Sequence, residues 1–287
     1  MALWLMPQQS LLKGLALLSL SALLFATMGV LIRLASHTVD NVTVVFMRNL
    51  TGTLLLLPFA LTQGKAFFIT HKPMMHLWRA LVGLAAMYGF FYAIAHLPLS
   101  NAMVFTYSSP VFIPLVAWLF LKERITPLML MAALVGLVGV ILVAKPNAEM
   151  FNWLSFVGIS SSFLAAMAFV TVRALTTTEP ATRIVFYFCL IATVVSAIPM
   201  FWHWRVLTQQ ELIYLVGTGS LATFSQISLS KAYSYAPAGK IGPANYLAII
   251  FAGIWAWILW GEVPDHTALV GMLLILIGLL LCLPKRR

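Results

Sequence analysis

Long apolar runs follow one another along the whole chain, separated by short segments that carry prolines, glycines and charges. Each run is close to the roughly 20 residues that an α-helix needs to cross the hydrocarbon core of a bilayer. Lipid offers no hydrogen-bond partners to an open backbone, so these runs predict helices. Ten transmembrane helices are expected, at residues 12–35, 41–62, 75–96, 100–121, 127–144, 153–175, 182–202, 211–235, 241–260 and 266–283.

The second half of the chain repeats landmarks of the first half. Tyr107 and Glu123 recur 139 residues later as Tyr246 and Glu262. Other matched pairs are Pro98 with Pro237, Trp118 with Trp257, Gly139 with Gly278 and, at an offset of 140, Arg33 with Arg173 and Phe46 with Phe186. Self-similarity of this kind determines the architecture, and it predicts two five-helix units, residues 1–146 and 147–287.

Because five is an odd number, the two units must cross the membrane in opposite directions. Inverted repeats are the plan of many secondary transporters, whose substrate site lies near the bilayer midplane between the repeats. The expected fold class is therefore an all-α integral membrane protein, with two inverted five-helix repeats around a central cavity.

Composition agrees with a membrane protein. The chain is 62% hydrophobic and only 8% charged, whereas about 25% of the residues of a soluble domain are charged. In a soluble protein the net charge of +10 would suggest a nucleic-acid partner. Here it indicates the excess of lysine and arginine that cytoplasmic loops carry, so the expected surroundings are a lipid bilayer and no nucleic acid.

Lysine and arginine positions also set the predicted orientation. With the N-terminus in the cytoplasm, thirteen of these residues lie on or near the inner side, Arg79 among them. Only four fall toward the outside, and they are Arg33, Arg48, Lys145 and Arg205. The bias predicts that both termini are cytoplasmic. The first apolar run is too long for a signal peptide and is interpreted as a retained helix.

Short motifs in both halves resemble a known family. The first half holds Phe46-Met47-Arg48, Ser109-Pro110 and Leu121-Lys122-Glu123, and the second holds Tyr235-Ala236-Pro237-Ala238 and Trp260-Gly261-Glu262. The pattern resembles the EamA type of the drug/metabolite transporter superfamily over nearly the whole chain. The resemblance implies ten helices, a cavity lined by helices 1, 3, 4, 6, 8 and 9, and export of small metabolites across a bacterial inner membrane. It implies no particular substrate, and since Ile249 stands opposite Pro110, a kink at Pro110 need not recur.

Motifs for catalysis or for a cofactor are absent from the sequence. It contains no phosphate-binding glycine loop, no HExxH and no CxxC, and all seven acidic residues lie at helix ends or in loops. No enzyme activity, catalytic residue, cofactor or metal site is therefore expected. Glu123 and Glu262 are interpreted as turn-fixing carboxylates near the start of the following helix. Without a carboxylate in mid-membrane, the protein is expected to be a facilitator or exchanger, or to couple protons through a less obvious group.

Tyr107 and Tyr246 are the first candidates for substrate binding. Each lies about 10 Å inside its helix at 1.5 Å per residue, and a phenol offers an aromatic face and one hydroxyl to an amphiphilic ligand. Ser108 and Asn245 stand beside them, and polar groups that face lipid are unfavourable. Ordinary packing or an interfacial position is the alternative for both tyrosines.

Four further residues complete the candidate site. Gln226, near the middle of its helix, is expected to orient the substrate or to bond a neighbouring helix. Tyr88 and Tyr92, at i and i+4, form either an aromatic wall or a packing pair. Arg48 is expected to contact a substrate carboxylate, or else to extend toward the outer interface.

These observations predict a secondary transporter that moves a small organic metabolite, amino-acid-like or another amphiphile, by alternating access and in the direction of export. Import or exchange of nucleobase- or nucleoside-type metabolites is the alternative. A channel would need a continuous polar ring, and a membrane enzyme would need convergent titratable groups. Four glycines indicate close helix contacts or a homodimer face, at Gly136, Gly139, Gly271 and Gly278.

Overall fold

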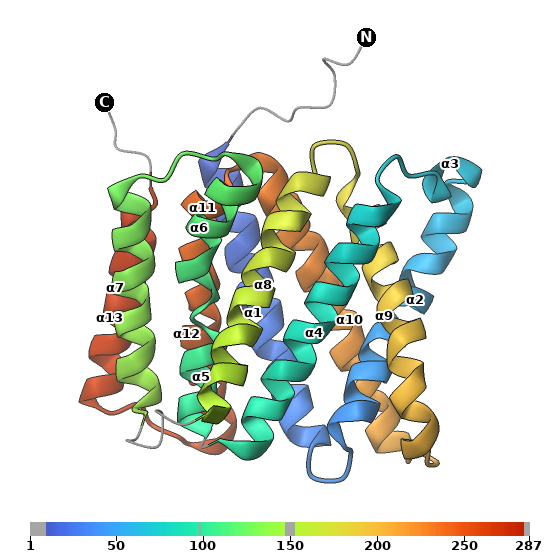
Figure 1. The fold of residues 1–287 in the computed structure, drawn as a ribbon. Helices are drawn as coiled ribbons and strands as arrows, with labels where there is room; N and C mark the ends of the chain where they lie inside the picture. Colours follow the sequence, from blue (N-terminus) through green and yellow to red (C-terminus); the bar gives the residue numbers. More distant parts are fainter. Residues whose placement is uncertain (1–9, 98, 147–152, 284–287) are drawn as a thin grey trace.

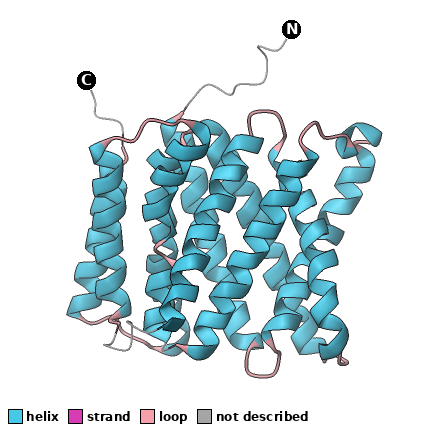
Figure 2. Ribbon diagram, in the orientation of Figure 1, coloured by secondary structure: helices cyan, strands magenta, loops and turns pink. Residues whose placement is uncertain are grey.

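The computed structural model describes residues 10–97, 99–146 and 153–283. Within them the regular elements are helices, which stand side by side (Figures 1 and 2). The first half holds α1 (Leu11–Ala35), α2 (Asn41–Thr62), α3 (Lys65–Phe68), α4 (Pro73–His96), α5 (Leu99–Thr106), α6 (Ser109–Leu121) and α7 (Pro127–Ala144). The second half holds α8 (Trp153–Leu175), α9 (Ala181–His203), α10 (Gln209–Tyr235), α11 (Ala238–Ile241), the 3₁₀ helix η2 (Gly242–Tyr246), α12 (Leu247–Trp260) and α13 (His266–Leu281).

The membrane-spanning segments confirm the predicted fold class. In the described ranges, nine helical segments are long and apolar enough to cross a bilayer, and α13 adds a shorter apolar helix of 16 residues. The α5–α6 and α11–α12 segments each count as one span. The start of α1 and the end of α13 lie at the same face of the bundle (Figure 1). The predicted boundary at residues 146 and 147 stays a prediction, since residues 147–152 lie outside the described ranges.

Helix starts and ends follow ordinary capping chemistry. Asp40, Thr126 and Asp265 each accept a hydrogen bond from a backbone N–H in the first turn of the helix that follows, which satisfies one of the exposed donors there. Lys122 and Gly261, which are repeat counterparts, end α6 and α12 in the left-handed conformation, with φ of 57° and 67°. The two halves therefore keep the same turn geometry although only one of them uses glycine.

Helices of the first half pack against helices of the second half, and the contacts across the boundary occur in pairs related by the repeat. The principal partners are α1 with α10, α4 with α8, α2 with α9, and α7 with α13. Ser21 in α1 hydrogen-bonds Ser225 in α10 at 2.9 Å. Their repeat counterparts meet as well, because Ser161 in α8 donates to the Ala86 carbonyl in α4 at 2.7 Å. One contact thus appears twice, which is the mark of an inverted repeat.

Both halves contain a broken fourth span, whereas the sequence interpretation considered a kink only at Pro110 in the first half. In the first half α5 ends at Thr106 and α6 begins at Ser109, next to Pro110, which has no N–H to continue the helical ladder. In the second half Gly242-Pro243 opens the 3₁₀ turn that precedes α12. The interruption therefore recurs at Tyr107 and Tyr246, although a different proline causes it in each half.

Glycines let α7 and α13 approach closely. A Cβ on Gly139 would lie 2.5 Å from the Gly271 carbonyl oxygen, and a Cβ on Gly278 would lie 2.9 Å from the Ala132 carbonyl oxygen. These are repeat-related contacts inside one chain. These glycines therefore do not support the predicted homodimer, and no described contact supports it.

We expect Gly139→Ala to separate α7 from α13 and to lower the apparent melting temperature of the detergent-purified protein. The added side chain meets backbone, and overpacking costs roughly 1–3 kcal/mol or more. Gly29→Ala in α1 is the matched control, because a Cβ there meets nothing within 4 Å. Equal melting temperatures for the two variants would contradict the tight α7–α13 contact.

Candidate substrate-binding site

A central cavity of about 200 Å³ lies between the two halves. Its described lining comes from α1, α4, the α5–α6 break, α8, α10 and the η2–α12 segment, with Arg48 added by α2 and Phe188 by α9. These include the six spans that the family resemblance implied. Both broken spans contribute to the wall, and discontinuous helices at mid-membrane are the usual frame of a transporter site.

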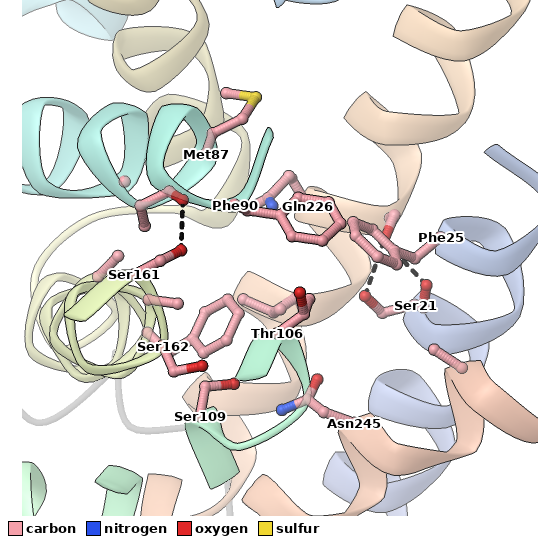
Figure 3. A pocket seen from close by; sticks show the side chains of 18 of the residues that line it. Ser21, Phe25, Met87, Phe90, Thr106, Ser109, Ser161, Ser162, Gln226 and Asn245 are labelled. Carbon is pink, nitrogen blue, oxygen red and sulfur yellow. Dashed lines mark hydrogen bonds between the residues drawn. The ribbon is translucent and has the colours of Figure 1, made fainter. Parts of the chain in front are cut away.

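Hydroxyl groups and aromatic rings face one another across the cavity (Figure 3). The Ser21–Ser225 pair lies on one side and Ser161 and Ser162 lie on the other. Ser162 donates to the Phe105 carbonyl beside the helix break. The apolar part of the wall includes Phe25, Met28, Met87, Phe90, Phe91 and Phe169. Such a mixture suits a ligand with an apolar body and a few polar groups.

Two arginines add positive charge to this wall. Arg48 and Arg79 are only 7% and 3% exposed as whole residues. Arg48 Nη1 lies 3.1 Å from the sulfur of Met87. Arg79 Nη2 donates to Gln226 Oε1 at 2.8 Å, and its guanidinium lies 3.6 Å from the centre of the Phe188 ring.

Four of the eight predicted residues line the cavity. They are Tyr107, Gln226, Asn245 and Arg48. Tyr107 lies at the helix break and packs near Ala22 and Ala248. Asn245 donates to the Gly242 carbonyl at 3.0 Å, so its amide is held at the 3₁₀ turn. Their contact with a substrate stays a prediction.

The other four predicted residues lie outside the described lining. Tyr246 is fully buried against α7, and its hydroxyl donates to the Ala133 carbonyl at 2.9 Å. A Cβ on Gly136 would lie 2.4 Å from the ring, so the tyrosine fills the space that this glycine leaves. Tyr246 thus packs against α7, outside the described lining of the cavity that Tyr107 faces, and its contact with a substrate stays a prediction.

Ser108, Tyr88 and Tyr92 make other contacts, and their role in binding stays a prediction. The Ser108 hydroxyl bonds the Val104 carbonyl at 2.7 Å, within its own span. Tyr88 packs against the buried cluster around Phe186 and Phe188. Tyr92 is 40% exposed near the end of α4 and stacks on His96, with ring centres 4.1 Å apart.

Arg79 is the functional candidate that the sequence interpretation missed. It lies only six residues into α4, about 9 Å at 1.5 Å per residue, so it was counted among the inner-edge charges. In the fold it points inward and does not reach the interface. Gly83 gives a usable signal, because it stands one turn later on the same face and a Cβ there would lie 2.9 Å from Arg79 Nη1.

Two ion pairs that are repeat counterparts lie at opposite faces of the bundle. Arg173 at the end of α8 bonds Glu123 at 3.2 Å, and Arg33 at the end of α1 bonds Glu262 at 2.7 Å. Each pair joins one half to the other. The interpretation of both glutamates as turn-fixing residues is wrong, because the capping side chains belong to Thr126 and Asp265.

The two ion pairs differ in exposure. The Arg173 and Glu123 side chains are 17% and 19% exposed, whereas those of Arg33 and Glu262 are 48% and 51% exposed. Arg173 also donates to the Tyr233 carbonyl at 2.6 Å. The connection between the halves is therefore more shielded at the face where α1 begins.

A loop carboxylate strengthens the same face. Glu179, between α8 and α9, is buried and accepts hydrogen bonds from Thr70 and Arg183, both at 2.6 Å. Burial alone raises the pKa of Glu179, but these two hydrogen bonds and the Arg183 charge outweigh it and hold the pKa below the ordinary value. Thr70 belongs to the first half, so this contact also crosses the boundary. In the described part of the chain, no group of three or more His, Cys, Asp or Glu side chains could hold a metal ion.

An inverted helical bundle with broken spans around a central cavity defines a membrane transporter. The model of the EamA-like transporter family matches residues 12–145 and again residues 152–283. The chain therefore belongs to the EamA-like transporter family, whose members are transporters and not enzymes.

Known proteins agree with this assignment. The pseudopaline exporter CntI of Pseudomonas aeruginosa is 34% identical over 269 residues, which cover 93% of this chain and 94% of that protein. The S-adenosylmethionine uptake transporter of Rickettsia bellii is 32% identical over 238 residues, or 81% of this chain and 80% of that one. A solved crystal structure matches with a TM-score of 0.80 at 17% identity, covering 93% of this chain and 95% of the other, and supports the fold alone.

The two repeat-related tyrosines give a matched test of site and scaffold. We expect Tyr246→Phe to lower the melting temperature by a few degrees without changing substrate affinity, since it loses a hydrogen bond worth about 1 kcal/mol. Tyr107→Phe should change substrate affinity with little effect on melting. Thermal unfolding and substrate competition on the purified variants measure both effects, and the opposite pattern would place Tyr246 in the site.

Proposed function

We propose that the protein exports a small amphiphilic organic metabolite, amino-acid-like and carrying a carboxylate, across a bacterial inner membrane by alternating access. The observation that carries the proposal is the pair of repeat-related ion pairs that join the halves at the two faces, with the central cavity between them. In inverted repeats, rocking one half against the other opens the site to each side in turn. Each ion pair then acts as a contact that must break when its own face opens.

The unequal exposure of the two ion pairs supports this mechanism. An exposed ion pair contributes about 0–1 kcal/mol, and the Arg33–Glu262 pair has a further contact, the Trp260 ring 4.1 Å from the Arg33 guanidinium. The Arg173–Glu123 contact is shielded and reinforced by Tyr233, so opening at that face costs more. Under the proposed orientation, with both termini in the cytoplasm, the more strongly closed face is the cytoplasmic one. The loop excess of lysine and arginine supports that orientation.

Export is favoured because the relative named as an exporter matches the chain over more of its length and at higher identity. The relative named as an uptake transporter supports import or exchange as a second candidate. A channel is less well supported, because the described lining is mostly apolar and a channel would need a continuous polar or charged ring.

Cysteine cross-linking tests the rocking motion. In the purified full-length protein in liposomes, we expect a disulfide between Arg173→Cys and Glu123→Cys, or between Arg33→Cys and Glu262→Cys, to stop substrate counterflow. Reduction should restore it. The native cysteines, Cys189 and Cys282, are buried.

Arg205→Cys with Glu211→Cys is the matched control. These residues also form an ion pair, but both belong to the second half and neither is in the described cavity lining. Their disulfide should leave counterflow intact. Undiminished counterflow with either of the two cross-boundary pairs closed would refute alternating access at that face.

A further inference from the structure

We propose that the substrate carries two carboxylates, and that Arg48 and Arg79 each bind one of them. This inference rests on the proposed transport function and specifies the charge of its substrate. It starts from the burial of two guanidinium groups in one cavity, neither of which has an anionic partner among the described residues.

Both guanidinium groups are well removed from water. At 7% and 3% exposure, neither extends to the membrane surface, although the sequence interpretation allowed this for Arg48. Burying an ion is strongly unfavourable unless an opposite charge and hydrogen bonds compensate it. In a membrane-spanning helix such a residue is a functional-site candidate for the same reason.

Compensation by this chain is missing within the described residues. The cavity lining there contains no Asp or Glu, and neither arginine takes part in any of the described ion pairs. Their contacts are a methionine sulfur, a neutral amide and an aromatic ring. Nε of Arg48 and both Nε and Nη1 of Arg79 have no hydrogen-bond partner among the described residues. These donors are therefore unpaired there, and no carboxylate of the described residues offsets the two charges.

The two cations are also neighbours. Arg48, Phe188 and Gln226 line a small side pocket next to the main cavity, and Arg79 bonds that same Gln226 and lies over that same ring. Like charges at close range repel. One carboxylate would neutralise only one of them, so a ligand with two acidic groups fits the pair better than an ordinary amino acid.

The remainder of the wall favours carboxylates on an apolar body. A guanidinium fork matches a carboxylate with two parallel hydrogen bonds. Half of the other residues in the described lining are phenylalanine, methionine or alanine, and seven carry hydroxyls. A guanidinium fork also matches phosphate, so phosphate esters are the competing class of ligand. The arginines come from α2 and α4 in the first half and Gln226 comes from α10 in the second. A ligand held between them would therefore span the boundary that moves in transport.

The test compares α,ω-dicarboxylates of four to eight carbons with their monoamides and with phosphate monoesters of similar length. Binding to the purified full-length protein is measured by thermal shift and by competition. We expect at least one dicarboxylate to bind at least tenfold more tightly than its monoamide and its phosphate analogue. Arg48→Gln and Arg79→Gln should each remove that preference, with Arg48→Lys weakening it less. Arg124→Gln, at an exposed arginine, is the control and should retain it.

Stability without ligand separates a binding role from a structural one. Because the buried charge is uncompensated, Arg79→Gln should melt at the same or a higher temperature than the parent protein while losing the preference for the dicarboxylate. A lower melting temperature with the preference intact would overturn the assignment. Equal response to dicarboxylates and monoamides, or tighter binding of the phosphate esters, would overturn it too.

Failure of this inference is distinguishable from failure of the proposed function. Counterflow of a neutral or monoanionic amphiphile, with indifference to dicarboxylates, would reject the two-carboxylate substrate and keep the carrier. Loss of counterflow for every compound would reject the carrier itself.

Discussion

Packing across the boundary between the two halves is the constraint on which the structure depends. Lipid neither hydrogen-bonds the backbone nor drives apolar helices together, so association rests on close packing and on a few polar contacts between helices. Here those contacts occur in repeat-related pairs, as with Ser21–Ser225 and Ser161–Ala86. Thr53 and Thr193, themselves repeat counterparts, meet at 3.2 Å between α2 and α9. Each half thus completes the other, and the cavity forms where the two broken spans interrupt this pairing.

Much of the fold could be predicted from the chain alone. The apolar runs and the 139-residue repeat give the spans, and the odd helix count gives the inversion. The helix break in the second half was missed because Ile249 is the repeat counterpart of Pro110, whereas Gly242 and Pro243 interrupt the helix at another position. Proline interrupts the helix in both halves, but the proline need not stand at the same position in the two repeats.

The site was less predictable, because a repeat relation pairs positions and not environments. Tyr107 and Tyr246 match in sequence, yet one faces the cavity and the other fills the space over Gly136. Arg79 was missed for a related reason. Its closeness to a helix start suggested an edge charge, and only the packing of α4 against α8 and α9 shows that it points inward. Glu123 and Glu262 pair with Arg173 and Arg33 of the opposite half, and the chemistry of the local turn could not indicate these partners.

The charge in the cavity does not follow the symmetry of the backbone. At the repeat offsets of 140 and 139 residues, Arg48 corresponds to Phe188 and Arg79 corresponds to Thr218. Phe188, the counterpart of Arg48, therefore lies beneath the guanidinium of Arg79. Two identical subunits could never achieve this, because each would bring its own arginine to every such position and double the repulsion. Joining the two copies in one polypeptide frees them to diverge, with one supplying cations and the other supplying the neutral surfaces that hold them.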